Sequence, residues 1–214
     1  MNYSFRKKNK IVKYIVLHYT GMKSLALAYQ KLSSESSNVS AHYLISRDGT
    51  IFNLLCPSYK AWHRGKSKWK NKNNLNDHSI GIEIENKGHE FNYSNFTNSQ
   101  YLSLKKLVFF LKRDFYIIDE NIVFHSDIAP DRKQDPGEKF FIKKIGINRF
   151  KKKKKIKVNY NMYELLILYG FHKSYVRKYR EQCICAVKRT LNYKKITSLQ
   201  SKKFLKDFYN LLFH

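Results

Sequence analysis

Cysteine, acidic residues and long apolar runs are all scarce in this chain. The three cysteines, Cys56, Cys183 and Cys185, are too few and wrongly spaced for a disulfide framework or a zinc ribbon, so we expect reduced thiols. The apolar stretch near the start, residues 11–17, is interrupted by Lys13 and is too short for a secretory signal or a membrane span. These features predict a cytoplasmic chain with no transmembrane segment.

Acidic residues are outnumbered: 16 Asp and Glu stand against 42 Lys and Arg, which gives a formal charge of +26. Such an excess attracts polyanions, among them nucleic acid, anionic membranes and carboxylate-rich cell-wall material. A second explanation stays open, because Lys, Asn, Ile, Tyr and Phe are enriched together, as AT-rich coding drift would also produce. No helix-turn-helix, zinc-finger or aromatic RNA-binding signature is present, so we expect no specific nucleic-acid partner.

The chain nevertheless has enough apolar residues to fold. Of its 214 residues, 43% are hydrophobic and 15% are aromatic, which suffices for one ordinary domain and a small second unit. The lysine-rich block 149-RFKKKKKIK-157 divides the sequence, because like charges in a row repel one another and stay solvated. We therefore expect a first domain at 1–147, a linker at 148–158 and a small domain at 159–214.

Patterns typical of strands and of helices alternate before the linker. They predict an α/β domain with a mixed central β-sheet flanked by helices. The run 79-SIGIEIEN-86 places three isoleucines on one face of a strand and Glu83 on the other. Thr97 and Gln100 form a capping box at the start of a helix. The expected strands are 11–19, 42–46, 50–55, 79–86 and 121–125, and a further helix is expected at 22–33.

After the linker the apolar spacing becomes helical. Three amphipathic helices are predicted, at 162–169, 176–191 and 205–212. Together they predict a small all-α helical bundle. A bundle of this size is marginal alone, so we expect it to dock on the first domain.

The stretch 125-HSDIAPDRKQDPG-137 holds two of the chain's three prolines. Two prolines and a glycine exclude a regular helix or a central strand there, so we expect a stiff, irregular loop. It begins with His125 after a strand, and His18 ends another strand; either histidine alone is more often structural. Together with Asp135 they offer two nitrogens and one oxygen, the donor set of catalytic zinc sites. Strand ends of α/β sheets are where such sites gather.

A metal alone does not complete a hydrolase, because the reaction also needs a base and a cation facing the developing oxyanion. Glu83 lies on the polar face of its strand, where a carboxylate either meets solvent or lines a cleft. Lys133 lies two residues before Asp135 and is close enough to face the same metal. In a chain with this many lysines it can equally be a surface residue.

Five blocks of the sequence occur in the order of a known family. They are 16-VLHYTG-21, 41-AHYLISRDGTI-51, 61-AWHRG-65, 77-DHSIGIEIEN-86 and 125-HSDIAPDRKQDPG-137. Over residues 11–145 the chain resembles the zinc-dependent N-acetylmuramoyl-L-alanine amidases. This type 2 amidase family also contains the animal peptidoglycan-recognition proteins. Within it, the sequence looks most similar to the bacterial anhydromuramyl-peptide amidases.

The resemblance implies a role for each chemical position. His18, His125 and Asp135 match the zinc ligands of the family, Glu83 its catalytic glutamate and Lys133 its catalytic lysine. The resemblance thus implies hydrolysis of the amide between N-acetylmuramic acid, or its 1,6-anhydro form, and L-alanine of the stem peptide. The implied partner is peptidoglycan or an anhydro-muropeptide.

Four further residues receive secondary assignments. Trp62 and His63 match positions where the family lines its cleft, so they are candidates for substrate contact. Glu85 shares the strand face of Glu83 but has no catalytic match, and we expect it to be structural. His42 is also expected to be structural. The last part of the chain, 159–214, is similar in length and helix pattern to the small peptidoglycan-binding domains of some family members, although a lysine-rich extension without a binding role stays open.

Other functions remain as alternatives. The first is a non-catalytic muropeptide-binding protein, although such proteins lack one or more metal ligands and this sequence lacks none. The second is a thiol peptidase that uses Cys56, which has no paired motif. The third is a nucleic-acid binder, which charge alone suggests. A cytoplasmic location favours recycling of anhydro-muropeptides, whereas a wall-binding tail favours the cell envelope.

Overall fold

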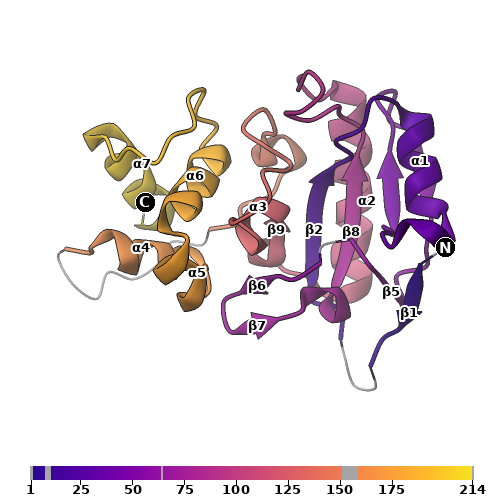
Figure 1. Cartoon of the computed structure of the whole chain (residues 1–214), viewed down its shortest axis with the longest axis horizontal. Coiled ribbons are helices and arrows are strands. Elements are labelled where there is room, and N and C mark those ends of the chain that lie inside the picture. Colours follow the sequence, from indigo (N-terminus) through magenta and orange to yellow (C-terminus); the bar gives the residue numbers. More distant parts are fainter. Residues whose placement is uncertain (1, 8–10, 64, 151–158, 214) are drawn as a thin grey trace.

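A five-stranded mixed sheet forms the centre of the molecule (Figure 1). The structure, a computed structural model, describes residues 2–7, 11–63, 65–150 and 159–213. The strands, in chain order, are β2 (Tyr14–Tyr19), β3 (Tyr43–Ile45), β4 (Ile51–Asn53), β8 (Ser79–Ile84) and β9 (Ile122–Phe124). In space they follow the order β4-β3-β8-β2-β9, with β4 antiparallel at one edge and the other four parallel. The predicted mixed α/β architecture is confirmed.

Two short ladders and several helices surround this sheet. The ladders pair β1 (Tyr3–Phe5) with β5 (Tyr59–Ala61) and β6 (Lys68–Trp69) with β7 (Lys72–Asn73). The helices are α1 (Leu25–Ser33), α2 (Asn98–Phe115), α3 (His125–Ile128), α4 (Met162–Tyr169), α5 (Lys173–Lys178), α6 (Arg180–Thr190) and α7 (Lys202–Phe213). Short 3-10 turns are η1 (Glu35–Ser37), η2 (Leu75–His78), η3 (Asp119–Asn121) and η4 (Ile142–Ile145). No described helix is both long and apolar enough to cross a membrane.

Helix α2 covers one face of the sheet. The predicted capping box is present, since the Gln100 N–H donates to Thr97 Oγ1 over 3.1 Å and the Thr97 N–H donates to Gln100 Oε1 over 3.0 Å. The alternation read from the sequence of β8 turns its isoleucines toward this helix. The shared core of the two layers includes Ile15, Leu17, Ile80, Ile82, Ile84, Leu104, Val108 and Leu111.

The candidate site lies on the opposite face of the sheet, between α1 on one side and the C-terminal helices on the other. On one side Leu32 of α1 packs on Leu44 of β3. On the other side Tyr14, Val16 and Val123 belong to the same buried cluster as the apolar side chains of α4, α6 and α7. The C-terminal helices lie beside the β9 edge of the sheet (Figure 1). They therefore share a core with the sheet instead of forming a separate one.

The C-terminal helices differ in number from the prediction. The single helix expected at 176–191 is two helices, α5 and α6, because Tyr179 leaves the helical region with φ −131° and ψ 45°. The apolar spacing continues across this break, which is why the sequence pattern did not reveal it. The division into domains at 1–147 and 159–214 stays a prediction.

Two further expectations need correction or qualification. The stretch from His125 begins with one helical turn, α3, before it becomes irregular, because Asp127 accepts the N–H of Phe124 and caps that turn. Of the expected linker 148–158, residues 151–158 lie outside the described residues. Its described start is not solvated throughout, since Arg149 is 4% exposed and pairs with Asp127.

Candidate metal centre and active site

Parallel strands bring the predicted site residues to one edge of the sheet. His18 lies near the carboxyl end of β2, and its register partner on β8 is Glu83. His125 directly follows β9, which pairs with the other side of β2. Because the carboxyl ends of three adjacent parallel strands lie on the same side of the sheet, residues far apart in sequence meet there. The Ser126 N–H donates to the Asp135 carbonyl over 3.0 Å, which closes the loop and returns Asp135 to His125.

His18, His125 and Asp135 form a buried cluster that could hold a metal ion. His18 Nδ1 lies 2.9 Å from His125 Nδ1, and both nitrogens lie 3.0 Å from Asp135 Oδ2. Three atoms that carry lone pairs repel one another at such distances unless a proton or a cation lies between them. The donor set and the separations therefore fit a metal ion.

Burial and charge set the protonation of this cluster. Burial lowers the pKa of His125 to about 4, which leaves its ring neutral and able to ligate at neutral pH. Burial also works to raise the pKa of Asp135, but the interaction with His125 and the hydrogen bonds with both histidines hold that pKa well below its usual range. The aspartate is thus an anion and the histidine a neutral donor, as metal ligation requires.

A hydrogen-bond chain orients the His18 ring. The Ser79 hydroxyl donates to the Leu75 carbonyl over 2.7 Å, so Ser79 Oγ accepts from His63 Nε2–H over 3.1 Å. His63 Nδ1 then accepts from His18 Nε2–H over 3.0 Å. In this arrangement the lone pair of His18 lies on Nδ1, the atom that faces His125 and Asp135. Such outer hydrogen bonds fix the tautomer and direction of a ligand ring.

Gly81 makes room for this chain. A Cβ atom at position 81 would lie 2.4 Å from Cγ of the His63 ring, far inside contact distance. The glycine of the β8 sequence SIGIEI therefore lets His63 lie against the strand and reach His18. His63 is 7% exposed and also lines the cleft.

The carboxyl group of Glu83 lines the same cleft as the cluster. Its Oε2 is buried and has no hydrogen-bond partner among the described residues. Burial raises the pKa of Glu83 to about 7; nearby His18 opposes this shift and Asp135 adds to it. A buried carboxyl with a pKa near neutrality can both take and give a proton at physiological pH.

The cluster lies at the base of a cleft of about 330 Å³. Lys133 is half-buried in its wall, two residues before Asp135 in the loop. Three further cations, Lys31, Lys87 and Arg132, line the cleft. The structure thus brings together Glu83, Lys133 and the three possible ligands around one cavity of the size that binds small molecules.

Four other residues singled out from the sequence lie elsewhere or have other partners. Trp62 does not line this cleft; its indole N–H donates to Ser4 Oγ over 3.2 Å. Glu85 Oε2 accepts the Arg47 N–H over 2.8 Å, a structural contact. Cys56 is a free, exposed thiol outside the cleft lining, so nothing in its position supports a thiol peptidase.

His42 is buried and bonded to backbone. Its Nδ1 accepts the Gly81 N–H over 2.9 Å, and its Nε2 lies 3.1 Å from the Tyr59 carbonyl, to which it donates. Both ring nitrogens are thereby used, as expected for a structural histidine.

Sequence reasoning missed the residues that support the loop from behind. Asp127 is fully buried and pairs with Arg149, and its Oδ1 accepts the Tyr169 hydroxyl over 2.8 Å. Arg149 was assigned to the lysine-rich linker, where one arginine among many cations gives no signal. The sequence offered one signal of this support, Asp127, because it is an acidic residue within the block that also holds His125, Lys133 and Asp135.

Comparisons with known proteins identify the family of this chain. The sequence profile of the N-acetylmuramoyl-L-alanine amidase family matches residues 7–138. The amidase AmiD of Escherichia coli K12 is 36% identical over 144 residues, 60% of this chain and 50% of AmiD. The 1,6-anhydro-N-acetylmuramyl-L-alanine amidase AmpD of Haemophilus influenzae is 41% identical over 103 residues, 48% of this chain and 54% of AmpD. The chain spans about half the length of these curated relatives.

Solved structures match nearly the whole chain. AmpDH3 of Pseudomonas aeruginosa, in complex with anhydromuramic pentapeptide, superposes with a TM-score of 0.79 and 27% identity over 96% of this chain and 93% of that one. AmiD of E. coli, with the substrate anhydro-N-acetylmuramic acid-L-Ala-D-gamma-Glu-L-Lys, gives a TM-score of 0.78 and 25% identity over 96% and 90%.

The fold and the site together define an α/β protein with three side chains that could hold a metal ion, in a donor set that metal-dependent hydrolases use. The family match covers more than half of the chain, and it includes all three possible ligands, Glu83 and Lys133. The chain belongs to the N-acetylmuramoyl-L-alanine amidase family.

Proposed function

We propose that the protein is a zinc-dependent amidase of peptidoglycan metabolism. It cleaves the amide between the lactyl group of N-acetylmuramic acid, or of its 1,6-anhydro form, and L-alanine of the stem peptide. One observation carries the proposal: Glu83, whose Oε2 is buried without a hydrogen-bond partner among the described residues, lines the same cleft as three side chains that could hold a metal ion. Two solved relatives are named as complexes with anhydromuramic peptides, which supports the substrate class.

Zinc fits the donor set better than the harder cations do. Two imidazole nitrogens and one carboxylate oxygen are a catalytic zinc set, whereas calcium and magnesium prefer oxygen ligands alone. Zinc–nitrogen bonds of about 2.0–2.1 Å place tetrahedral ligands roughly 3.3 Å apart. The separations of 2.9–3.0 Å among His18, His125 and Asp135 are close to that value. When bound, zinc supplies a Lewis acid that polarises the substrate carbonyl and acidifies the attacking water.

Glu83 moves the protons in this proposal. Its carboxylate takes a proton from the water as the water attacks the lactyl carbonyl, and it returns that proton to the nitrogen of the leaving L-alanine. A pKa near 7 suits both steps, because neither protonation state is strongly disfavoured at neutral pH. The first transfer prevents positive charge from developing on the attacking water oxygen. The second prevents negative charge from developing on the leaving nitrogen.

Lys133 stabilises the negative charge that develops on the carbonyl oxygen. Its half-buried position in the cleft wall excludes part of the solvent, which strengthens its attraction for an anion. Farther out, Lys31, Lys87 and Arg132 offer positive charge along the same cleft. Stem peptides carry several carboxylates, so these cations would capture the peptide part of the substrate.

The experiment that tests this function compares two substrates. Purified protein is incubated with a defined anhydromuramyl tripeptide and with whole sacculi, with and without a chelator, and the products are identified by mass spectrometry. We expect release of the intact peptide from the muramyl group, and loss of activity on chelation that zinc restores. Uncut substrates in the presence of zinc would refute the amidase proposal.

The same experiment distinguishes two cellular settings for the reaction, the cytoplasm and the cell envelope. Cleavage of the soluble tripeptide alone would support recycling in the cytoplasm, and cleavage of sacculi would support action at the cell envelope. In the second case residues 159–214 are the part proposed to bind peptidoglycan. Zinc-dependent binding of either substrate without cleavage would instead support a non-catalytic muropeptide-binding protein.

A further inference from the structure

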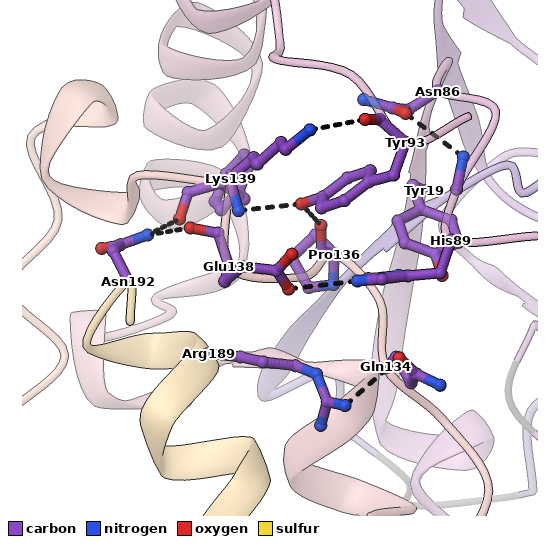
Figure 2. Close-up of polar contacts among 12 residues, drawn as sticks. Tyr19, Asn86, His89, Tyr93, Gln134, Pro136, Glu138, Lys139, Arg189 and Asn192 are labelled. Atoms are coloured by element: carbon purple, nitrogen blue, oxygen red, sulfur yellow. Dashed lines mark hydrogen bonds and ion pairs between the residues drawn. The ribbon is translucent and has the colours of Figure 1, made fainter. Parts of the chain in front are cut away.

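The loop that carries Lys133 and Asp135 is held by Asn192, the second residue after the end of α6. Asn192 Nδ2 donates to the Glu138 carbonyl over 2.7 Å and to the Phe140 carbonyl over 2.8 Å (Figure 2). Asn192 has a positive φ of 56°, a conformation that asparagine adopts more readily than most residues. One amide group from the C-terminal helices thereby satisfies two backbone acceptors of the catalytic loop.

A second contact reaches between the two site residues of the loop. Arg189 Nη2 donates to Gln134 Oε1 over 3.2 Å, and Gln134 lies between Lys133 and Asp135 in sequence (Figure 2). Arg189 is 9% exposed, so its direction is set by packing of α6.

The other end of the same loop is held from the same helices. Asp127 lies two residues after His125, and its Oδ1 accepts the Tyr169 hydroxyl of α4 over 2.8 Å. The Tyr169 oxygen also lies 2.7 Å from Thr190 Oγ1, at the end of α6. The loop is thus held near His125 by Tyr169, which Thr190 of α6 contacts in turn, and beyond Asp135 by Asn192.

Residues that precede the loop in sequence, Tyr93 and His89, also contact it. The Tyr93 hydroxyl donates to the Pro136 carbonyl over 2.7 Å and accepts the Lys139 N–H over 3.0 Å (Figure 2). His89 Nε2 lies 3.1 Å from Glu138 Oε2. Beyond α3 the backbone hydrogen bonds within the loop are turn contacts, such as the Lys133 N–H to the Ala129 carbonyl and the Phe140 N–H to the Gly137 carbonyl. Side chains from both sides satisfy further backbone groups and so help to determine its path.

We propose that the end of α6, through Asn192 and Arg189 and with Tyr169 of α4, positions the loop 125–140 so that its metal ligands and Lys133 keep their geometry. The inference rests on the proposed function of that loop. It gives the C-terminal helices a role within the active site, separate from any binding of peptidoglycan. Asn192, Arg189 and Tyr169 are positioning residues, because they act through the loop.

The test uses substitutions in the full chain that each change one side chain that holds the loop. N192D keeps the size and tolerates the backbone conformation, but it turns a carboxylate oxygen toward two carbonyls. N192G removes the side chain and also tolerates the positive φ. Y169F deletes only the hydroxyl that Asp127 accepts, and the ring keeps its packing. K188M is the matched control, because Lys188 Nζ bonds Thr197 and Leu199 carbonyls within the C-terminal region and does not contact the loop.

Zinc affinity is measured by competition with a chelator dye, without substrate, and backbone amide exchange is measured over residues 133–140. We expect N192D and N192G to weaken zinc binding by roughly 10–100-fold, the usual effect of lost outer support at a metal site. Exchange in the loop should accelerate in both, and Y169F should show a smaller change. K188M should lower the melting temperature while zinc affinity stays at the wild-type value.

Wild-type zinc affinity and loop exchange in N192D and Y169F would overturn the proposal. So would an equal loss of zinc affinity in K188M, because the effect would then be one of global stability. The proposed function fails separately, through a wild-type protein that binds zinc and cleaves no muropeptide. If the wild type bound no zinc, amide exchange in the loop would still test the proposal. Faster loop exchange in N192D than in K188M would support it, and equal exchange would overturn it.

Discussion

Two glutamates, Glu83 in β8 and Glu85 just after the end of that strand, have different environments. Glu85 accepts the Arg47 N–H, whereas Glu83 has a buried oxygen for which the described part of the chain offers no hydrogen-bond partner. A buried, unpaired carboxylate costs free energy and persists where it has a chemical use. The contrast separates the proposed base from a structural acid of the same type two residues away.

Substitution of this pair tests the base directly. We expect E83Q to lower kcat by roughly 10²–10⁴-fold, because the amide cannot accept the proton of the attacking water. Zinc content and the melting temperature should stay near the wild-type values. E85Q is the matched control and should retain activity, since its side-chain oxygen can still accept the Arg47 N–H. Steady-state kinetics and metal analysis of both variants check this, and near-normal activity in E83Q would remove Glu83 from the mechanism.

His42 predicts a dependence of stability on pH. Burial, together with the charge of Arg6, lowers its folded pKa to about 4, while an unfolded histidine titrates near 6.5. Between these values the unfolded state binds the extra proton, so the free energy of unfolding falls as the pH drops from about 6.5 to about 4. The slope from this group is at most about 1.4 kcal/mol per pH unit.

The measurement compares urea unfolding of wild type and H42N at several pH values. H42N keeps an acceptor for the Gly81 N–H but does not titrate. Its unfolding free energy should fall less steeply across this pH window, and the two pH dependences should run parallel above about pH 6.5. Equal slopes in the acid range would contradict the assignment.

At the scale of the element, β8 combines three tasks in one short sequence. Its isoleucines face α2, its Glu83 faces the cleft, and its Gly81 leaves space for the ring of His63. Alternation along the sequence placed the isoleucines on one face and Glu83 on the other, and it left open whether Glu83 meets solvent or a cleft. The third depends on a residue 18 positions earlier in the chain and could not be read from β8 alone.

The G81A variant tests whether that space matters for the metal. The added Cβ atom would displace the His63 ring, which accepts the His18 hydrogen bond, so the direction of the His18 ring would be lost. We expect zinc affinity to fall by about 10-fold or more, with a lower melting temperature. A G81A protein that binds zinc like the wild type would show that His63 does not orient His18.

At the scale of the whole molecule, the excess of positive charge has two explanations. The cations around the cleft favour a role in capturing anionic substrate, and the composition favours coding drift. Salt distinguishes them, because an increase in ionic strength from about 0.1 to about 1 M shortens the Debye length from about 10 to about 3 Å.

If the charge captures substrate, KM for sacculi should rise by on the order of 10-fold across that range while kcat changes little. A smaller rise is expected for the soluble tripeptide, which carries fewer charges. Initial rates at several salt concentrations give both values. A KM that does not respond to salt would favour drift.

The sequence by itself determined the features that depend on local pattern. Strand alternation, the capping box at Thr97 and the mixed α/β class follow from side-chain periodicity along short segments. The possible ligands were identified from their donor types, with His18 and His125 at strand ends and Asp135 in a proline-containing loop, and from the family resemblance of the motifs that hold them.

The tertiary structure decided which buried polar groups meet. Asn192 reaches a loop 54 residues earlier, and Tyr169 reaches Asp127 across 42 residues. Neither pairing leaves a periodic signal, because it arises from the packing of the C-terminal helices beside β9. For the same reason, the sequence did not indicate that Arg149, which lies in a lysine-rich block, is buried. Local periodicity specifies elements, whereas contacts between distant segments exist only once those elements pack.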